Sequence, residues 1–252
     1  MIKRLNLALA IGSLLFINVF CTSTKSSVNG LSKKEEKEGW KLLFDGKTTN
    51  GWHTYLQDTV GSKWQVKDGA ITFVPAQGRV GGGDIVTNEE FENFDFRLEW
   101  KVVKGSNSGI IFDIQEDHQY NATYFTGPEM QVLDNIDGQD KNPETHLAGC
   151  LYDIAGSAAV SKPRPVGEWN QVRILQNKGH LTLWLNGIQT YDGQMGSEEW
   201  NTLVAKSKFG RPGRNGLPNP DFANFGKLAK GKIALQEHPG SSSWRNIKIR
   251  KL

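Results

Sequence analysis

The sequence contains very little cysteine, and this limits how the fold can be stabilised. Only two cysteines, Cys21 and Cys150, occur among 252 residues. Small secreted domains that depend on disulfides carry many more, so a disulfide framework is excluded as the main source of stability. Cys150 lies among small and apolar residues with no activating neighbour in the sequence, which predicts a buried and unreactive thiol.

The sequence also lacks an excess of charge of either sign. Its formal net charge is +3, and this falls to +1 without Lys3 and Arg4 of the first twenty residues. No group of lysines and arginines is interleaved with aromatic residues, so no nucleic-acid partner is expected. The glycines at 81–83 are not followed by a helical pattern, so they do not predict a phosphate-binding loop, and no nucleotide cofactor is expected.

Long apolar runs are missing except at the N-terminus. There, Lys3 and Arg4 precede a mostly apolar stretch that ends at Phe20, whereas a membrane-spanning helix needs about 20 apolar residues. A basic start followed by a short apolar run is typical of a secretory signal peptide. We therefore expect residues 1–20 to be a signal peptide and the protein to be exported.

Cys21 directly follows this apolar run and precedes a polar stretch. That order resembles a bacterial lipoprotein signal, in which the cysteine becomes the lipidated N-terminus and anchors the protein in the cell envelope, on the periplasmic side or at the cell surface. The residues before Cys21 are not the usual small ones, so cleavage without lipidation is the alternative. Residues 21–39 are polar and predict a flexible linker, with the charged run 33–38 as a solvated tether or a short helix.

From Trp40 onward the pattern changes to short strands separated by turn residues. Apolar and polar residues alternate over 94–102, the apolar run 110–112 indicates a strand buried on both faces, and Asp68-Gly69 indicates a hairpin turn. Helical periodicity is scarce, and 197–206 is the best candidate for a short helix. Residues 40–252 are therefore expected to form a single all-β domain, a sandwich of two antiparallel sheets or a jelly roll.

Two apolar stretches carry polar side chains at alternating positions. Alternate side chains of a strand share a face, so Glu129 lies with Gln131, and Gln236 lies with His238. A carboxylate or imidazole two residues from an amide suits a sugar-sized polar ligand on an exposed sheet face. The alternative is that both pairs are exposed strand ends or turns.

Several short segments, taken together and in order, resemble those of the 3-keto-disaccharide hydrolase domain family. They read LFDGK at 43–47, GW at 51–52, EEFENF at 89–94, NSGI at 107–110, EMQVLDN at 129–135, AGCLY at 148–152, WN at 169–170, LNG at 185–187, LQEH at 235–238 and RNIKIR at 245–250. The resemblance covers nearly all of residues 40–252. One departure is the stretch after Ile110, which lacks the arginine that many relatives carry there.

The resemblance implies a concanavalin A-like jelly roll that binds its ligand on one concave sheet face. It also implies that the substrate is a glycoside whose C3 hydroxyl has been oxidised to a ketone by a partner sugar 3-dehydrogenase. Such a ketone acidifies the C2 proton, so a base can start an elimination at C1, and water can then add back. His238 is the leading candidate for this base because imidazole titrates near neutral pH, and Glu129 is the alternative.

The other expected roles are the binding of substrate and of a metal ion. The substrate-binding candidates are Gln131, Gln236, His146, Tyr152 and Asn186. A divalent metal held by Glu129, His146 and His238 is a candidate electrophile. Core packing and an Asn-Gly turn are the alternatives for Tyr152 and Asn186. In the long loop predicted over 208–224, Arg211 and Arg214 are either part of the site or surface decoration.

Two other functions remain open at this point. A non-catalytic surface glycan-binding module would use the same sandwich. A conventional glycosidase would need two carboxylates that flank the bond, but the stretch Glu129-x-Gln131-x-x-Asp134 has an amide in the middle. The odd spacing from Glu129 to Asp134 also sends these side chains to opposite faces of a regular strand, so a mechanism with two carboxylates is not favoured.

Overall fold

The computed structural model describes residues 27–75, 81–140, 142, 144–212 and 219–252. One set of strands consists of β1 (Lys41–Leu42), β3 (Trp64–Lys67), β4 (Ala70–Phe73), β6 (Phe94–Val102), β9 (Asn170–Asn177), β10 (His180–Leu185), β11 (Ile188–Gln194) and β13 (Ser242–Lys251). A second set consists of β2 (Trp52–Thr54), β5 (Ile85–Thr87), β7 (Asn107–Ile114), β8 (Glu129–Leu133) and β12 (Lys232–Leu235). The helices are α1 (Lys33–Lys37), α2 (Glu198–Lys206) and the 3₁₀ turns η1 (Thr123–Phe125) and η2 (Pro220–Phe222).

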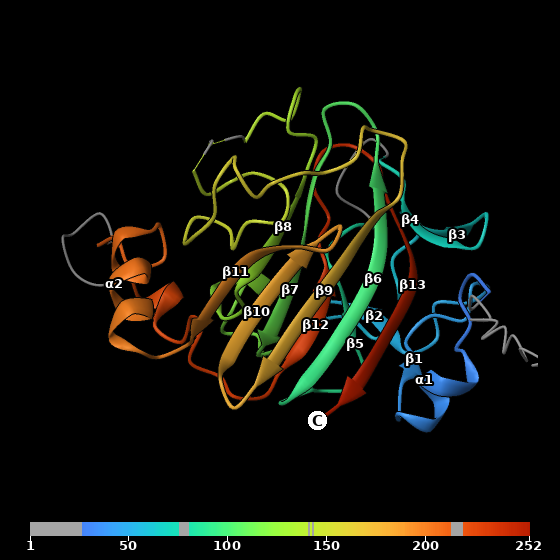
Figure 1. The fold of residues 1–252 in the computed structure, drawn as a ribbon, viewed down its shortest axis with the longest axis horizontal. Helices are drawn as coiled ribbons and strands as arrows, with labels where there is room; N and C mark the ends of the chain where they lie inside the picture. The colour runs from blue at the N-terminus through green and yellow to red at the C-terminus, as the bar shows by residue number, and fades with distance from the viewer. Residues whose placement is uncertain (1–26, 76–80, 141, 143, 213–218) are drawn as a thin grey trace, which may run out of the picture.

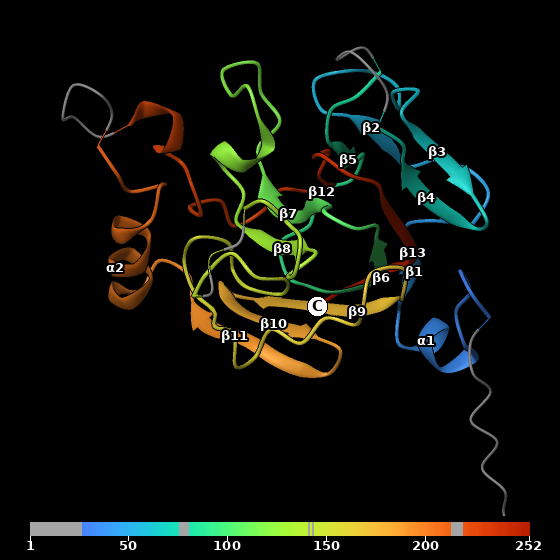
Figure 2. The same cartoon turned by 90° about the horizontal axis from the view of Figure 1, so that it is seen from above.

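These strands form two antiparallel sheets that pack face to face (Figure 1). The larger sheet has the order β11-β10-β9-β6-β13-β4-β3, with β1 paired to β13, and the smaller has the order β2-β5-β12-β7-β8. Figure 2 shows the two layers from above, with β9, β10 and β11 in one and β7, β8 and β12 in the other. The prediction of an all-β jelly-roll sandwich with few short helices is confirmed.

The main core lies between the two sheets. Along β6, Phe96, Leu98 and Trp100 are buried in this core, while the alternating Arg97 and Glu99 are partly exposed, as a half-buried strand requires. Strand β7 is buried along its whole length, because Ile110 faces the core between the sheets and Ile111 belongs to a second apolar cluster on the other side. The main cluster extends from Phe44 to Ile249, so residues 40–252 contain a complete core of their own.

Asx-Gly pairs close two of the hairpins. Asp68 and Gly69, between β3 and β4, have φ values of 49° and 70°, and Asn186 and Gly187, between β10 and β11, have 52° and 83°. Positive φ at both central residues is the signature of the type I′ turn, which matches the twist of the flanking strands. Helix α2 begins after Ser197, whose side chain accepts a hydrogen bond from the backbone N–H of Trp200.

Part of the predicted linker is ordered against the larger sheet. Ser32 and Glu35 form a capping box at the start of α1, and Glu35 is paired with Lys248 of β13. The side chain of Asn29 donates to the carbonyl oxygen of Gly69 and accepts from the backbone N–H of Asn246. Polar contacts therefore hold residues 27–39 against the sheet, in contrast to the flexible linker predicted there. That prediction rested on low apolar content, which gives no information about polar contacts. In Figure 1, α1 lies beside β13.

The predicted signal peptide (residues 1–20) and Cys21 lie outside the described residues. In the part of the chain that the structure describes, no helix has the length and apolar character needed to cross a membrane. Cys150 is a buried free thiol whose pKa is raised by burial, in agreement with the prediction of an unreactive cysteine.

Candidate active site

Glu129, Gln131 and Gln236 lie on the face of the smaller sheet that is turned away from the main core, and His238 follows Gln236 beyond the end of β12. In β8, Met130 and Val132 point into the core, so Glu129 and Gln131 point the other way. The backbone N–H of Gln236, which directly follows β12, donates to the carbonyl oxygen of Gly109 in β7. The Nε2 atom of Gln236 lies 3.4 Å from Oε2 of Glu129, which joins the two predicted polar pairs into one group.

A glycine in β7 makes room for the Glu129 carboxylate. In the register of β7 and β8, Gly109 is opposite Gln131, and Ile111 is opposite Glu129. A Cβ atom at position 109 would lie 2.0 Å from Oε1 of Glu129. The carboxylate therefore lies over the bare backbone of Gly109, in a place that a side chain on β7 would otherwise fill.

The environment of Glu129 favours its neutral, protonated form. Its side chain is only 4% exposed, and this burial raises its pKa to about 8, an effect that nearby Lys208 opposes and that Asp84 and Asp140 increase. At neutral pH the group is then mainly a carboxylic acid, which can donate a proton. From the sequence, Glu129 is the alternative candidate for the base. A protonated carboxyl group would act in the opposite way, as a proton donor.

The environment of His238 acts in the other direction. Burial lowers the pKa of its imidazole, the negative charge of Asp140 opposes this, and Lys208 adds to it. The Nδ1 atom of His238 is buried without a hydrogen-bond partner among the described residues. Lys208 and Asp140 thus act on both Glu129 and His238, and the pKa values of this candidate acid and candidate base are moved apart.

The side chain of Gln131 has no partner in the part of the chain that the structure describes. It is 1% exposed, yet neither its amide nitrogen nor its oxygen makes a hydrogen bond there. On the same face of β7, Oδ1 of Asn107 is buried and also lacks a partner among these residues. A buried polar atom without a partner costs about 1–3 kcal/mol, so such atoms in one place indicate a site that a polar ligand completes.

Further polar side chains lie beside β8, the last strand of the smaller sheet. The backbone of residues 149–152 continues the sheet there, because the N–H groups of Gly149 and Tyr152 donate to the carbonyl oxygens of Gln131 and Glu129. The hydroxyl of Tyr152 donates to Oδ2 of Asp140 at 2.6 Å, and burial raises the pKa of this phenol further above its usual value. The site therefore has a wall next to Glu129.

His146 belongs to this wall. Its ring stacks on Tyr152 with 4.4 Å between the ring centroids, its Nδ1 lies 3.2 Å from Asp140, and its Nε2 lies 2.9 Å from Asp153. Both ring nitrogens thus face carboxylates within the protein. Its position suits a residue that orients Tyr152 and Asp140.

Lys208 is a component of the site that sequence reasoning misses. Its Nζ lies 4.3 Å from the ring centroid of Tyr152 and 5.3 Å from that of Tyr124, and its backbone N–H donates to Asp153. It acts electrostatically on both Glu129 and His238. The only feature of the sequence that points to Lys208 is its place at the start of the long predicted loop. Of the two predicted arginines, Arg211 is exposed and Arg214 lies outside the described residues.

A cleft of about 280 Å³ opens beside this group. Its lining includes Gln236, His238, Tyr55, Asp84 and Tyr124. Burial raises the pKa of Asp84 to about 6, although hydrogen bonds from Thr123 and the backbone of Glu237 favour its charged form. Aromatic rings with convergent polar groups around a cleft of this size suit a sugar.

Residues 39–250 match the family described as the 3-keto-alpha-glucoside-1,2-lyase-like domain. The chain is 33% identical over 247 residues to a protein of Bacteroides thetaiotaomicron named 3-keto-disaccharide hydrolase, a match that covers 90% of this chain and 83% of that protein. The chain belongs to this family. The predictions of the family and of an enzyme that cleaves glycosidic bonds are thereby confirmed.

Two solved structures from Parabacteroides distasonis, each named as a candidate glycosyl hydrolase, support the same family fold. One is 31% identical with a TM-score of 0.77 and matches over 90% of this chain and 100% of its own. The other is 27% identical with a TM-score of 0.60 and matches over 84% of this chain and 99% of its own.

Two residues considered in the sequence analysis, Asn186 and Asp134, do not belong to this site. Asn186 lies in the β10–β11 turn of the larger sheet, where its side chain bonds to Asn170 and to the backbone of Lys162 and Gln171. A turn-forming role explains these contacts, because the Asn-Gly turn requires positive φ. Asp134 accepts hydrogen bonds from the backbone N–H groups of Gly105 and Ile136, which lower its pKa despite partial burial, so it is not a second catalytic carboxylate beside Glu129.

The residues named for a metal do not form a shared ligand set. Among the described residues, no group of three or more His, Cys, Asp or Glu side chains could hold a metal ion. Both ring nitrogens of His146 are taken up by Asp140 and Asp153, and Glu129 contacts Gln236. The donor set of Glu129, His146 and His238 therefore does not fit one divalent ion.

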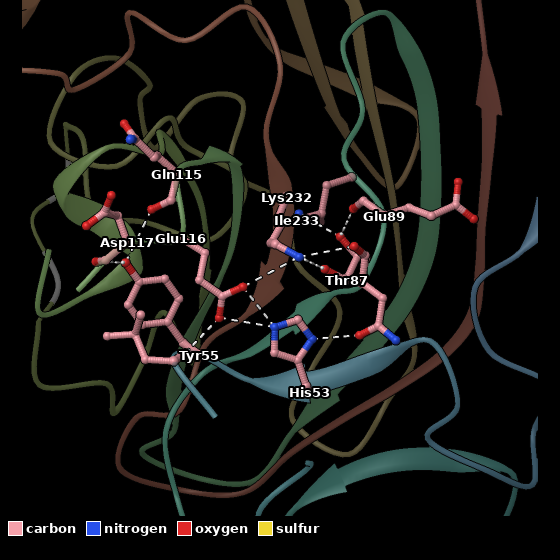
Figure 3. A network of polar contacts seen from close by, with 11 residues as sticks. His53, Tyr55, Thr87, Glu89, Gln115, Glu116, Asp117, Lys232 and Ile233 are labelled. Carbon is pink, nitrogen blue, oxygen red and sulfur yellow. Dashed lines mark hydrogen bonds and ion pairs between the residues drawn. The ribbon is translucent and has the colours of Figure 1, made fainter. Parts of the chain in front are cut away.

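A separate polar network lies at the opposite edge of the smaller sheet. Figure 3 shows the carboxylate of Glu116 facing both His53 of β2 and Lys232 of β12. Glu116 lies 2.9 Å from Nε2 of His53 and 3.5 Å from Nζ of Lys232, and it accepts from the backbone N–H of Leu56. Burial alone would raise the pKa of Glu116, but these contacts lower it. The network fixes the loop that brings Tyr55 to the cleft.

Proposed function

We propose that the protein cleaves the glycosidic bond of 3-keto-glycosides by removing the C2 proton, eliminating the group at C1 and adding water. The name of the Bacteroides relative supports this class of substrate. The observation that carries the mechanism is a cleft lined by His238 and by Gln236, whose amide lies 3.4 Å from Glu129. The pKa values of Glu129 and His238 are shifted in opposite directions. An elimination requires a base and an acid in one place, and these two environments would supply both.

The first step uses His238 as the base. The C3 ketone acidifies the C2 hydrogen, so the neutral imidazole takes this proton and the electron pair of the C–H bond moves to the C3 oxygen. An enediolate with a negative oxygen forms. The cation of Lys208, which already acts on both Glu129 and His238, is our candidate for stabilising this charge.

The second step uses Glu129 as the acid. The electron pair returns from the C3 oxygen, a C1–C2 double bond forms, and the bond from C1 to the leaving oxygen breaks. A protonated Glu129 gives its proton to that oxygen, which otherwise would leave as an alkoxide. Addition of water across the double bond then completes the net hydrolysis. The amide of Gln131, which makes no hydrogen bond to any described residue, and the side chain of Gln236 would hold sugar hydroxyls in this geometry.

The substrate also implies a partner and a place. A glycoside with a ketone at C3 is the product of an alcohol oxidation, so a partner sugar 3-dehydrogenase would supply it. We further propose that the protein is exported by residues 1–20 and anchored in the cell envelope through a lipid on Cys21, where it would meet glycosides oxidised by such a partner.

The test is a product assay on the chain from Ser27 to the C-terminus, which contains the whole core and α1. The 3-keto forms of trehalose, lactose and an aryl glucoside are offered beside their unoxidised parents, with and without a chelator. Cleavage of the keto forms alone is the expected result. Cleavage of the parents would instead indicate a conventional glycosidase, and glycan affinity without turnover would indicate a binding module. Loss of activity with the chelator would identify a metal as the electrophile in place of Lys208.

A further inference from the structure

Cationic side chains gather on the outer face of the larger sheet, which lies on the far side of the core from the candidate active site. They come from three strands, namely Arg97 and Lys101 of β6, Arg173 of β9, and Arg245, Lys248 and Arg250 of β13. Strands β9, β6 and β13 are neighbours in the sheet, so the six side chains form one continuous patch. We refer to it as the basic face.

The carboxylates of the basic face are too few to neutralise it. Asp95, whose side chain is fully buried, is bonded to Arg97 and Arg173 at 2.9–3.3 Å and has Arg250 at 3.5 Å. Only two further acidic groups are paired with this face, Glu99 with Arg245 and Glu35 with Lys248. Among the described residues, six cations thus meet three carboxylates, and the face has a formal charge of +3.

This charge is asymmetric within the molecule. The first 26 residues contain three basic residues and no acidic one, so residues 27–252 contain 27 of each sign and are formally neutral. With +3 on this face, the formal charges of all the other residues in 27–252 sum to −3, a sum that counts the buried Glu129 as charged. Such an asymmetry orients a protein when it approaches an anionic surface.

Tryptophans lie beneath the cations. The guanidinium of Arg97 lies 4.4 Å from the ring centroid of Trp40, that of Arg173 lies 4.6 Å from Trp184, and that of Arg245 lies 4.0 Å from Trp169. These contacts hold the cationic groups against the sheet. Trp169 and Trp184 are themselves half-buried. Tryptophan beside basic side chains is typical of protein surfaces at the level of lipid headgroups.

The N-terminal segment joins the domain at the same face. Ser27 and Gly30 line a groove of about 480 Å³ together with Arg97, Arg173 and Trp184. Cys21 precedes Ser27 by six residues, and a chain of six residues spans at most about 20 Å. A lipid on Cys21 would therefore keep the basic face, and not the active-site cleft, close to the bilayer.

We propose that the basic face docks on a membrane surface that contains anionic lipid headgroups. Its cations meet the phosphates and its tryptophans lie at the interface, so the active-site cleft on the other sheet is directed away from the bilayer. Binding through this face does not require the lipid on Cys21, although the anchor would strengthen it. The inference also stands independently of the proposed catalytic activity.

The test measures vesicle binding by the chain from Ser27 onward, which lacks the anchor and contains the complete core. Vesicles of phosphatidylcholine alone are compared by sedimentation with vesicles of equal parts phosphatidylcholine and phosphatidylglycerol. We expect binding only to the anionic vesicles, and we expect it to weaken as salt is added. Equal binding to both kinds of vesicle, or binding to neither, would overturn the proposal.

A double variant, R97Q/K101Q, removes two charges and leaves Asp95 with Arg173 and Arg250. Each cation near an anionic membrane contributes about 1 kcal/mol, or roughly fivefold, so the affinity should fall about 25-fold. The matched control, K206Q/K227Q, removes two exposed lysines from other parts of the surface and should bind as the wild type does. Equal losses in the two double variants would show that the total charge, and not this face, is responsible.

A further variant guards against misfolding of R97Q/K101Q. Lys101→Glu changes the charge by the same two units at a single half-exposed side chain, which contacts the ring of Trp169. This variant should lose about as much affinity as R97Q/K101Q. A sulfated polysaccharide is offered to all proteins in parallel. Binding to this polymer without binding to anionic vesicles would assign the face to an acidic glycan and overturn the membrane proposal.

Discussion

The smaller sheet carries two polar groups at opposite edges, and they differ in how well their atoms are partnered. At the β2 edge, Glu116 accepts from Leu56 and faces His53 and Lys232, so its pKa is lowered. At the β8 edge, the amide of Gln131 lacks a hydrogen bond among the described residues, and the pKa of Glu129 is raised to about 8. Similar residue types therefore have opposite electrostatic outcomes in one sheet.

The difference separates structure from function. A satisfied network stabilises the charged state of its members and fixes the loops around it. An unsatisfied group costs stability, and proteins retain such groups where a ligand or a reaction uses them. We therefore assign the Glu116 network to stability and the Glu129 group to catalysis, and each assignment can be broken by substitution.

The largest expected effect is on catalysis at the β8 edge. Replacing His238 by Gln removes the base while keeping a polar side chain, and kcat on a 3-keto-glycoside should fall by about 10²- to 10⁴-fold. The melting temperature should stay within a few degrees of the wild type. His180→Gln is the control, because His180 is an exposed residue paired with Asp192, and this variant should retain full activity. Normal turnover by the His238 variant would remove His238 from the mechanism.

The next effect tests the position of the Glu129 carboxylate. In Gly109→Ala, the new Cβ would lie 2.0 Å from Oε1 of Glu129 and displace the carboxyl group. A displacement of this kind near the chemistry costs up to about 100-fold in rate, so we expect kcat to fall by roughly 10- to 100-fold. Steady-state kinetics on the purified variant measure this. Full activity would mean that the carboxyl group need not lie over Gly109.

The third effect concerns stability at the β2 edge. Glu116→Ala removes the acceptor of the Leu56 N–H and the partner of Nε2 of His53, and it removes the ion-pair partner of Lys232, whose Nζ keeps its bonds to backbone carbonyl oxygens. It should lower the free energy of unfolding by about 2–3 kcal/mol. The exposed Glu168 provides the control, because Glu168→Ala should change it by less than about 0.5 kcal/mol. Urea titrations measure both values. An unchanged Glu116 variant would contradict the structural role of this network.

The smallest effect has the opposite sign. Gln131→Leu removes a buried amide whose atoms lack partners among the described residues, so the free energy of unfolding should stay the same or rise by about 1–2 kcal/mol. Because the same amide is expected to bind a sugar hydroxyl, KM should increase. A loss of stability together with an unchanged KM would show that Gln131 is a structural residue.

The strands and turns were accessible to sequence reasoning because their signals are local. Alternation over 94–102 and the Asx-Gly pairs report φ/ψ preferences and burial of neighbouring residues, and β6 and the hairpins follow them. The same local logic placed Glu129 with Gln131 and Gln236 with His238. The Asn186-Gly187 turn is also local, but its turn preference alone did not separate Asn186 from the substrate-binding candidates. Its contacts with Lys162 and Asn170 explain it as a turn residue.

The remaining features depend on contacts between distant parts of the chain. Lys208 and Asp140 reach Tyr152 from two separate loops, and no periodic pattern marks them. The packing of α1 rests on a few polar bonds, such as Glu35 with Lys248. The raised pKa of Glu129, which supports its proposed role as the acid, depends on burial that the sequence of β8 alone does not determine.

The most direct test of the central claim is the pH dependence of kcat/KM on a 3-keto-glycoside. We expect a bell-shaped profile. It should rise through a pKa below the usual 6.5 of histidine as His238 becomes neutral, and it should fall near pH 8 as Glu129 loses its proton. Glu129→Gln should abolish the alkaline limb and leave the acid limb in place. A profile of unchanged shape in this variant would contradict the assignment of Glu129 as the acid.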